Sequence, residues 1–236
     1  MSFLRQGGRL RHCVLAAVLW WAWPAIAVAQ QAPALRPGHF TLGAAVVRAG
    51  TYDIGDATAQ LTGNAPGVSP PPFTLFQARS RLTAATLPEF TLGFAFTRRL
   101  ALEAGASLSS PRVAVAISGD QEAPAQELPG EQLGQYQFEA ALTWQVPMRI
   151  HRRIAPFAIV GGGYLRQLHE GRTVVETGEV YFAGAGARYW LRGASGRSLA
   201  FGIRGDARLN VRRRGIDFEN LTRSYPSLSL GVFLGL

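Results

Sequence analysis

Apolar and polar side chains alternate along much of the chain. In residues 134–146, GQYQFEAALTWQV, one parity runs through Tyr136, Phe138 and Leu142, and the other runs through Gln135 and Glu139. Successive side chains of a β-strand point to opposite faces, so this pattern predicts a strand with one apolar and one polar face. The apolar face would point inward in a soluble sandwich and outward, at lipid, in a membrane barrel.

Seven further segments carry the same alternation: residues 39–46, 89–97, 100–108, 155–166, 180–191, 198–211 and 227–236. In 155–166 the pattern places Phe157, Ile159 and Leu165 on the apolar face, opposed to Tyr164 and Arg166. Helical periodicity is scarcely visible, and no mature segment approaches the ~20 apolar residues of a helical span. The sequence therefore predicts an all-β protein of eight strands.

The links between these strands alternate in length. Short links lie at 97–99, 147–153 and 192–197, and long links lie at about 50–86, 109–133, 167–178 and 212–226. Outer-membrane barrels have short periplasmic turns and long external loops. The alternation favours an eight-stranded antiparallel up-and-down transmembrane β-barrel whose long links are external. The first of these, with GVSPPPF at 67–73, is expected to be irregular and to offer a partner-contact surface.

Charged residues of both signs lie on the polar faces, deep within the strands. The bore of an eight-stranded barrel is only about wide enough for side chains, and an unpaired ion in a dry interior costs several kcal/mol. We therefore expect a lumen ion-pair network, with the apolar faces turned to lipid. Its expected members are Glu103, Glu139, Arg166, Arg188, Arg204, Asp206 and Arg208.

Aromatic residues lie close to the three short links, where a membrane barrel has a periplasmic-side girdle. The expected girdle is Phe96, Trp144, Phe157, Tyr189 and Phe201. Phe90, Tyr136 and Tyr181 lie nearer the long links and could form the opposite belt.

Residues 1–29 have the pattern of a secretory signal peptide: arginines without acids, an apolar run and a final Ala27-Val28-Ala29. Cleavage would leave a short lead-in at 30–37 and the barrel at 38–236. The formal charge would fall from +9 to +6, because three arginines leave with the leader. The single cysteine, Cys13, would leave too, so neither a disulfide nor a thiolate site is expected.

Two stretches resemble the small eight-stranded outer-membrane barrels of Gram-negative bacteria, the OmpA-like, OmpX-like and opacity-type proteins. They are EFTLGFAFTRRLALEAGAS at 89–107 and RRIAPFAIVGGGYLR at 152–166. The resemblance implies export to the cell outer membrane, insertion by the barrel-assembly machinery, and a monomer. The family usually ends in an aromatic residue, whereas this chain ends in Leu236, with Phe233 three residues earlier.

The function expected from these features is a structural or surface-interaction role, with external loops that contact lipopolysaccharide or extracellular partners. Arg212, Arg213 and Arg214 are the candidate contacts for lipopolysaccharide phosphates, since arginine binds phosphate well. The short links are basic as well, which suits anionic headgroups of the inner leaflet. Neither a cofactor nor a metal is expected, because the mature histidines are scattered, and export removes the protein from nucleic acid.

Three alternatives remain open. The protein could be a narrow channel for small solutes, or a lipid-modifying enzyme that uses His169 and Ser109 with Glu170 or Glu176. The third alternative concerns the fold: an exported soluble barrel of lipocalin type. If the protein has the structural or surface-interaction role favoured above, no enzymatic activity is expected.

Overall fold

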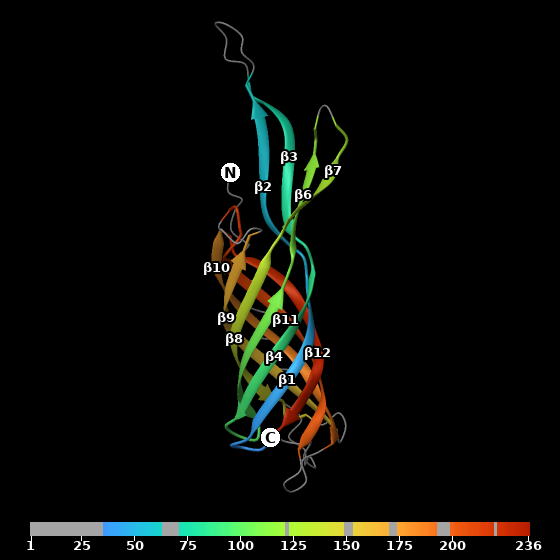
Figure 1. Ribbon diagram of the computed structural model, residues 1–236, viewed down its shortest axis with the longest axis vertical. Coiled ribbons are helices and arrows are strands. Elements are labelled where there is room, and N and C mark those ends of the chain that lie inside the picture. Colours follow the sequence, from blue (N-terminus) through green and yellow to red (C-terminus); the bar gives the residue numbers. More distant parts are fainter. Residues whose placement is uncertain are drawn as a thin grey trace, which may run out of the picture.

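The computed structural model describes residues 35–62, 71–120, 123–148, 153–169, 174–192, 199–219 and 221–236. Eight strands form a closed antiparallel barrel in the order β1-β12-β11-β10-β9-β8-β5-β4 (Figure 1). The barrel strands are β1 (Phe40–Ala49), β4 (Ala85–Ala95), β5 (Leu100–Ser109), β8 (Gly134–Gln145), β9 (Ile154–Leu168), β10 (Val175–Arg192), β11 (Ala200–Arg214) and β12 (Arg223–Gly235). The predicted all-β, eight-stranded up-and-down barrel is confirmed.

A second sheet rises from one end of the barrel, away from the C-terminus (Figure 1). It contains β2 (Tyr52–Leu61), β3 (Phe73–Leu82), β6 (Arg112–Ser118) and β7 (Gln126–Gln132), in the order β2-β3-β6-β7. We call it the protruding sheet. It is built from the first two long links, which the sequence pattern did not identify as strands. β-Bulges shift the β2–β3 register between Asp53 and Gly55 and between Ala59 and Gln60, so neither strand keeps one parity.

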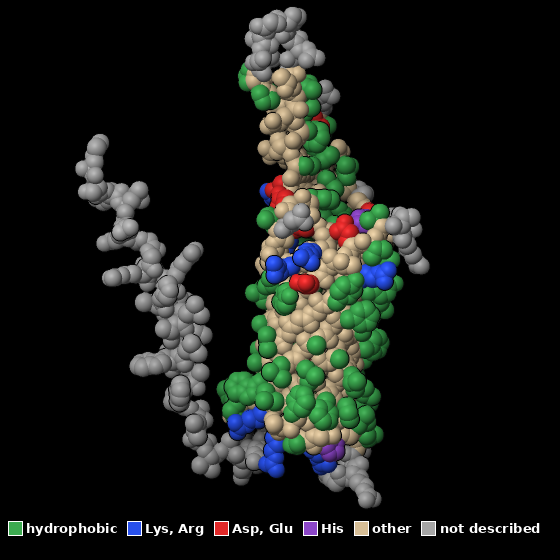
Figure 2. All heavy atoms as spheres, turned by 90° about the vertical axis from the view of Figure 1, so that its left-hand side faces the viewer, with side chains coloured by type: hydrophobic (Ala, Val, Ile, Leu, Met, Phe, Trp, Pro, Cys, Tyr) green, Lys and Arg blue, Asp and Glu red, His purple; other side chains and the backbone are tan. Residues whose placement is uncertain are grey.

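Large apolar side chains project from the outside of the barrel on the face shown in Figure 2. Phe138 is 57% exposed and Leu230 is 65% exposed, whereas Glu103, Arg188 and Asp206 are buried. A soluble barrel would have the opposite distribution, because exposed apolar surface is costly in water. The predicted outward apolar face of these strands is therefore present.

Strand β9 has the opposite orientation to the one its sequence pattern predicts. Phe157, Ile159 and Leu165 are buried inside the barrel, and Tyr164 and Arg166 are exposed on its outside. Both parities of this strand carry apolar residues, so alternation alone could not assign its faces. Burial of aromatic rings beneath lumen arginines decides the orientation.

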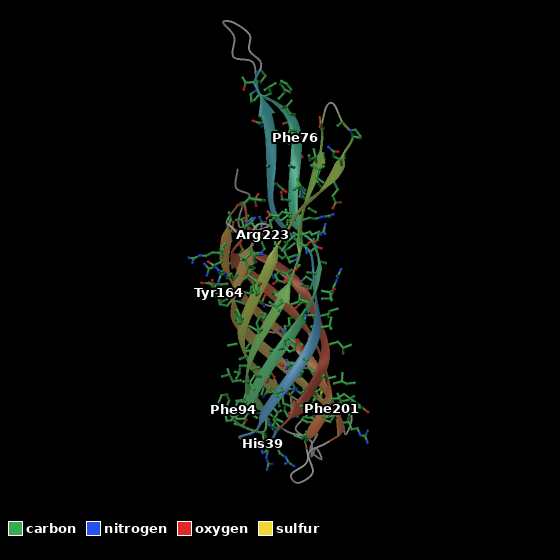
Figure 3. All side chains as sticks on the ribbon, in the orientation of Figure 1. His39, Phe76, Phe94, Tyr164, Phe201 and Arg223 are labelled. Atoms are coloured by element: carbon green, nitrogen blue, oxygen red, sulfur yellow. The ribbon has the colours of Figure 1, made fainter. Side chains whose placement is uncertain are left out.

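The C-terminal strand closes the barrel against β1. The Leu236 amide donates to the Phe40 carbonyl at 2.9 Å, and His39 Nδ1 lies 2.5 Å from the Leu236 carbonyl oxygen. Figure 3 labels His39 at this end of the barrel. Within the described residues, no helix is long and apolar enough to cross a bilayer. The predicted leader, most of the predicted lead-in, and Arg149, His151, Arg152, Glu170 and Arg197 lie outside the described residues.

Candidate functional site

The lumen holds a network of buried ion pairs. Arg188 on β10 lies directly opposite Arg204 on β11 in the strand register. Like charges in this position repel, but Glu103 of β5 reaches between them across the bore. Its two carboxylate oxygens accept from Arg188 at 2.6 Å and from Arg204 at 2.7 Å. One carboxylate therefore joins opposite walls of the barrel.

Arg208 is the second centre of the network. Its guanidinium donates to Asp206 at 2.6 Å, to Glu139 at 2.8 Å and to Glu89 at 3.0 Å. Arg204, Asp206 and Arg208 follow one another on the same face of β11, because alternate residues of a strand share a face. Arg204 also contacts Asp206 at 3.2 Å, which joins the two centres into one network.

Aromatic rings lie beneath the guanidinium groups. Arg188 and Arg204 lie 4.8 and 4.7 Å from the centroid of the Phe157 ring, and Arg208 lies 5.1 Å from that of Phe182. Such cation–π contacts satisfy the faces of guanidinium groups that hydrogen bonds leave open. Gly186 makes room for this stacking, since a Cβ there would lie 2.7 Å from Phe157 Cζ.

Six of the seven residues expected in the lumen network meet there: Glu103, Glu139, Arg188, Arg204, Asp206 and Arg208. Arg166 does not, because it lies on the outward face of β9 and is exposed. Sequence reasoning missed Glu89, which is buried and pairs with Arg208. The available signal was that Glu89 lies on the face opposite to that of the apolar Phe90. Glu89 was, however, taken only as the first residue of the predicted strand.

A cavity of about 20 Å³ lies beside this network, lined among others by Glu89, Glu103, Arg188, Arg204 and Ser229. A water molecule needs about 10–15 Å³ measured in this way. The cavity therefore accommodates roughly one water, and ion pairs cross the bore beside it.

Arg212 closes the lumen at the end that carries the protruding sheet. It is buried and donates to Tyr52 Oη, to Gln167 Oε1, and to the carbonyl oxygens of Arg214 and Ile216. The expectation that Arg212 contacts lipopolysaccharide phosphates together with Arg213 and Arg214 is therefore wrong for Arg212. Arg213 points outward by alternation. Arg214 is exposed, and its own backbone has a φ of 63°.

An apolar cap covers this end of the lumen. Ile54, Leu82, Leu133 and Ile216 are buried against one another, and Tyr52 packs against them. The Tyr52 ring also stacks on Tyr225 with centroids 4.8 Å apart. These residues come from the protruding sheet, from the β7–β8 junction and from the β11–β12 link. The protruding sheet is thus fixed to the barrel by a small core of its own.

The β11–β12 link is held by Asp217. Its carboxylate accepts from Arg223 at 2.6 Å and from the backbone amides of Glu219 and Leu221 at 2.9 and 3.3 Å. Burial alone would raise the pKa of Asp217, but these donors together hold it below its ordinary value. Arg223 lies at the foot of the protruding sheet in Figure 3.

His169 lies between two carboxylates at the rim of the barrel. Its Nδ1 is 2.8 Å from Glu131 of β7, and its Nε2 is 3.7 Å from Glu176 of β10. Among the described residues, no hydrogen bond joins His169 to Ser109. The described residues also contain no cluster of histidines, cysteines and acids that could hold a metal ion.

The expected aromatic girdle is formed in part. Phe96, Trp144 and Phe201 are exposed on the barrel surface, and Tyr189 is half-buried. Phe157 was assigned to the girdle wrongly, because it lies in the lumen beneath two arginines. At the other end, Phe90, Tyr136 and Tyr181 are exposed.

Comparison with known proteins finds no matching family model and no matching curated protein. Three solved structures are similar in part. The outer membrane protein OprG from Pseudomonas aeruginosa has a TM-score of 0.48 and 12% identity, over 87% of this chain and 99% of that one. The attachment invasion locus protein Ail of Yersinia pestis has a TM-score of 0.40 and 10% identity, over 85% of this chain and 100% of that one. The outer membrane protease OmpT from Escherichia coli has a TM-score of 0.28 and 8% identity, over 88% of this chain and 98% of that one.

At these identities and TM-scores, the neighbours say nothing about the activity of this chain. Its architecture rests on its own barrel: eight antiparallel strands in closed order, an apolar exterior and a charged, filled lumen. The chain therefore has the fold of the small eight-stranded outer-membrane β-barrels.

Proposed function

We propose that this protein is an exported outer-membrane barrel with a surface-interaction role. The barrel anchors the chain in the bilayer, and the protruding sheet stands outside the cell. The observation that carries the proposal is this four-stranded sheet, which continues beyond the barrel end and is fixed there by its own apolar core. A barrel that served only as an anchor would not need so ordered an external structure.

The filled lumen favours this role over that of a channel. Ion pairs from Glu103 and Arg208 join opposite walls, and Arg212 with the apolar cap closes one end. Opening a path for solutes would require breaking buried ion pairs, at a cost of about 3–5 kcal/mol each. We therefore propose that the lumen does not conduct, and flat current traces from purified protein in planar bilayers would support this.

A non-enzymatic role is part of the proposal. An acyl-transfer site would need a serine within hydrogen-bond reach of His169. In the described structure both ring nitrogens of His169 face carboxylates instead. H169A should leave the lipid A mass spectrum of the host membrane unchanged.

Cysteine labelling on whole cells tests the proposed orientation. If the leader is cleaved, the mature chain contains no cysteine, so S118C and R99C each introduce a single thiol. Ser118 is exposed on the protruding sheet, and Arg99 is exposed in the turn at the other end of the barrel. A membrane-impermeant maleimide should label S118C on intact cells.

R99C is the matched control for this experiment, and it should react only after the outer membrane is permeabilised. Labelling of R99C but not S118C on intact cells would place the protruding sheet in the periplasm. That result would overturn the proposed role.

A further inference from the structure

Three arginines on or beside the protruding sheet are paired with acids. Arg79 contacts Asp56 at 3.2 Å, Arg81 contacts Glu127 at 2.7 Å, and Arg223 contacts Asp217 at 2.6 Å. Three exposed arginines near the barrel rim differ: Arg166 and Arg213 on the outward face, and Arg214 at the end of β11. They are here named the outer arginine patch. Among the described residues, their guanidinium groups make no ion pair or hydrogen bond.

The outer arginine patch spans three neighbouring strands. Arg213 and Arg214 end β11 and Arg166 is near the end of β9, with β10 between these strands. In the register, Arg214 lies opposite Gly178 and Arg166 lies opposite the preceding residue, Thr177. Figure 2 shows two groups of blue side chains at this level of the barrel, one of them with a red side chain beside it. Glu179 lies directly opposite Arg213 in the register, and its carboxylate accepts from the Tyr181 hydroxyl at 3.0 Å, so the patch holds three arginines and one acid.

Exposed tyrosines lie next to the patch, on the side of the apolar belt. Tyr164 on β9 lies opposite Glu179, and Tyr181 follows two residues further along β10. Both rings are exposed on the outside of the barrel, and Figure 3 labels Tyr164 there. Tyrosine is typical of the level of lipid headgroups, because its ring is apolar and its hydroxyl is polar. The patch therefore lies at headgroup level rather than free in the external medium.

A low strip of small side chains runs along the barrel surface from the tyrosines toward its middle. Ala183, Ala185 and Ala187 alternate along the outward face of β10, and Ala185 lies opposite Ala158 of β9 and Ala207 of β11. Val160 and Leu209, both exposed, stand on either side of Ala183. The strip is apolar and its side chains are short, which leaves room for an acyl chain along the strand. We call it the alanine strip.

From these features we infer that the outward face of β9–β11 binds one phosphorylated glycolipid of the outer leaflet, of the lipid A class. The outer arginine patch would hold a phosphate by charge-assisted hydrogen bonds. The tyrosines would contact the sugar level, and an acyl chain would lie on the alanine strip. The inference rests on the proposed function, because that function places this end of the barrel in the outer leaflet.

Binding of diphosphoryl lipid A to the detergent-solubilised full-length protein, measured by native mass spectrometry, tests the inference. The variant R166Q/R213Q/R214Q should bind roughly tenfold more weakly or worse, since each charge-assisted hydrogen bond contributes more than a neutral one. The control R48Q/R79Q/R81Q removes the same charge elsewhere on the outer half and should bind like the wild type. Unheated and heated samples on gels establish that every variant is folded.

Two further measurements distinguish binding of a lipid from binding of a free anion. A185F fills the alanine strip with an apolar side chain and leaves all arginines in place, so it should also weaken lipid A binding. Millimolar inorganic phosphate should compete poorly. Equal binding by the patch variant and the wild type would overturn the inference, and so would effective competition by phosphate with no effect of A185F.

The cysteine labelling described above distinguishes the two proposals. Labelling of S118C on intact cells together with unchanged lipid A binding by the patch variant would refute this inference alone. Labelling of R99C in place of S118C would refute the proposed function as well.

Discussion

At the residue scale, the lumen shows how a barrel keeps charges away from water. Arg208 is buried, yet three carboxylates from β4, β8 and β11 surround its guanidinium. Glu103 does the converse by joining two arginines. Each ion is expensive to bury alone, so the members of the network depend on one another.

Replacing Arg208 with leucine should therefore destabilise the barrel strongly. R208L would leave Glu89, Glu139 and Asp206 close together without their shared cation. The expected loss is about 3–5 kcal/mol in the free energy of unfolding, measured by urea titration of vesicle-folded protein with tryptophan fluorescence. R213L, which removes an arginine without ion pairs, should change the free energy of unfolding by less than about 0.5 kcal/mol.

Two neighbouring glycines provide a second test at this scale. A Cβ at Gly186 would lie 2.3 Å from the Gly205 carbonyl oxygen and 2.6 Å from Asp206 Cβ. A Cβ at Gly205 points outward, where the nearest atom is 3.6 Å away. G186A should lower the free energy of unfolding by about 1–3 kcal/mol through overpacking, whereas G205A should be nearly neutral. Equal losses of unfolding free energy for G186A and G205A in the urea titration would mean that the lumen and outward faces of these strands are assigned wrongly.

At the element scale, alternation was reliable where only one parity carried bulky apolar side chains. Residues 134–146 and 227–236 meet that condition, and Phe138 and Leu230 do point outward. Strand β9 carries apolar residues on both parities, so its lumen-facing Phe157 was taken for a girdle residue. Its true position depends on Arg188 and Arg204, which come from other strands and share no local signal with it.

The protruding sheet was missed for a related reason. Its bulges interrupt the two-residue period, and its strands lie in links that were expected to be external loops. Arg212 adjoins Arg213 and Arg214 in the sequence, yet alternation turns it into the lumen. Its partners Tyr52 and Gln167 come from distant segments, and no local pattern predicts them.

The β11–β12 link should respond to acid through Asp217. The folded pKa of Asp217 lies below its ordinary value of 3.8, so its stabilising contribution is complete above the unfolded pKa. It is lost as the pH falls through the folded pKa. The amide proton shifts of Glu219 and Leu221, followed by NMR in micelles, should titrate with a midpoint below 3.8. D217N should abolish this titration, and a midpoint at or above that value would contradict the assignment.

At the scale of the whole molecule, the account depends on which side of the barrel wall meets lipid. L230R would place a charge on the apolar exterior, where the cost at mid-bilayer is about 2–4 kcal/mol. S118R would place the same charge on the exposed protruding sheet and should cost almost nothing. Urea titration in vesicles measures both, and a similar free energy of unfolding for the two variants would count against a membrane location.

The two tryptophans that remain after loss of the predicted leader test this central claim most directly. Trp144 is 44% exposed on the outward face, and Trp190 is 6% exposed and packs inside against Phe233. W190F and W144F leave one of them each, so fluorescence in vesicles of brominated phospholipids reports each residue separately. We predict strong quenching of Trp144 in W190F and weak quenching of Trp190 in W144F. Quenching of Trp190 and not Trp144, or of neither, would contradict a barrel that faces lipid with its apolar side.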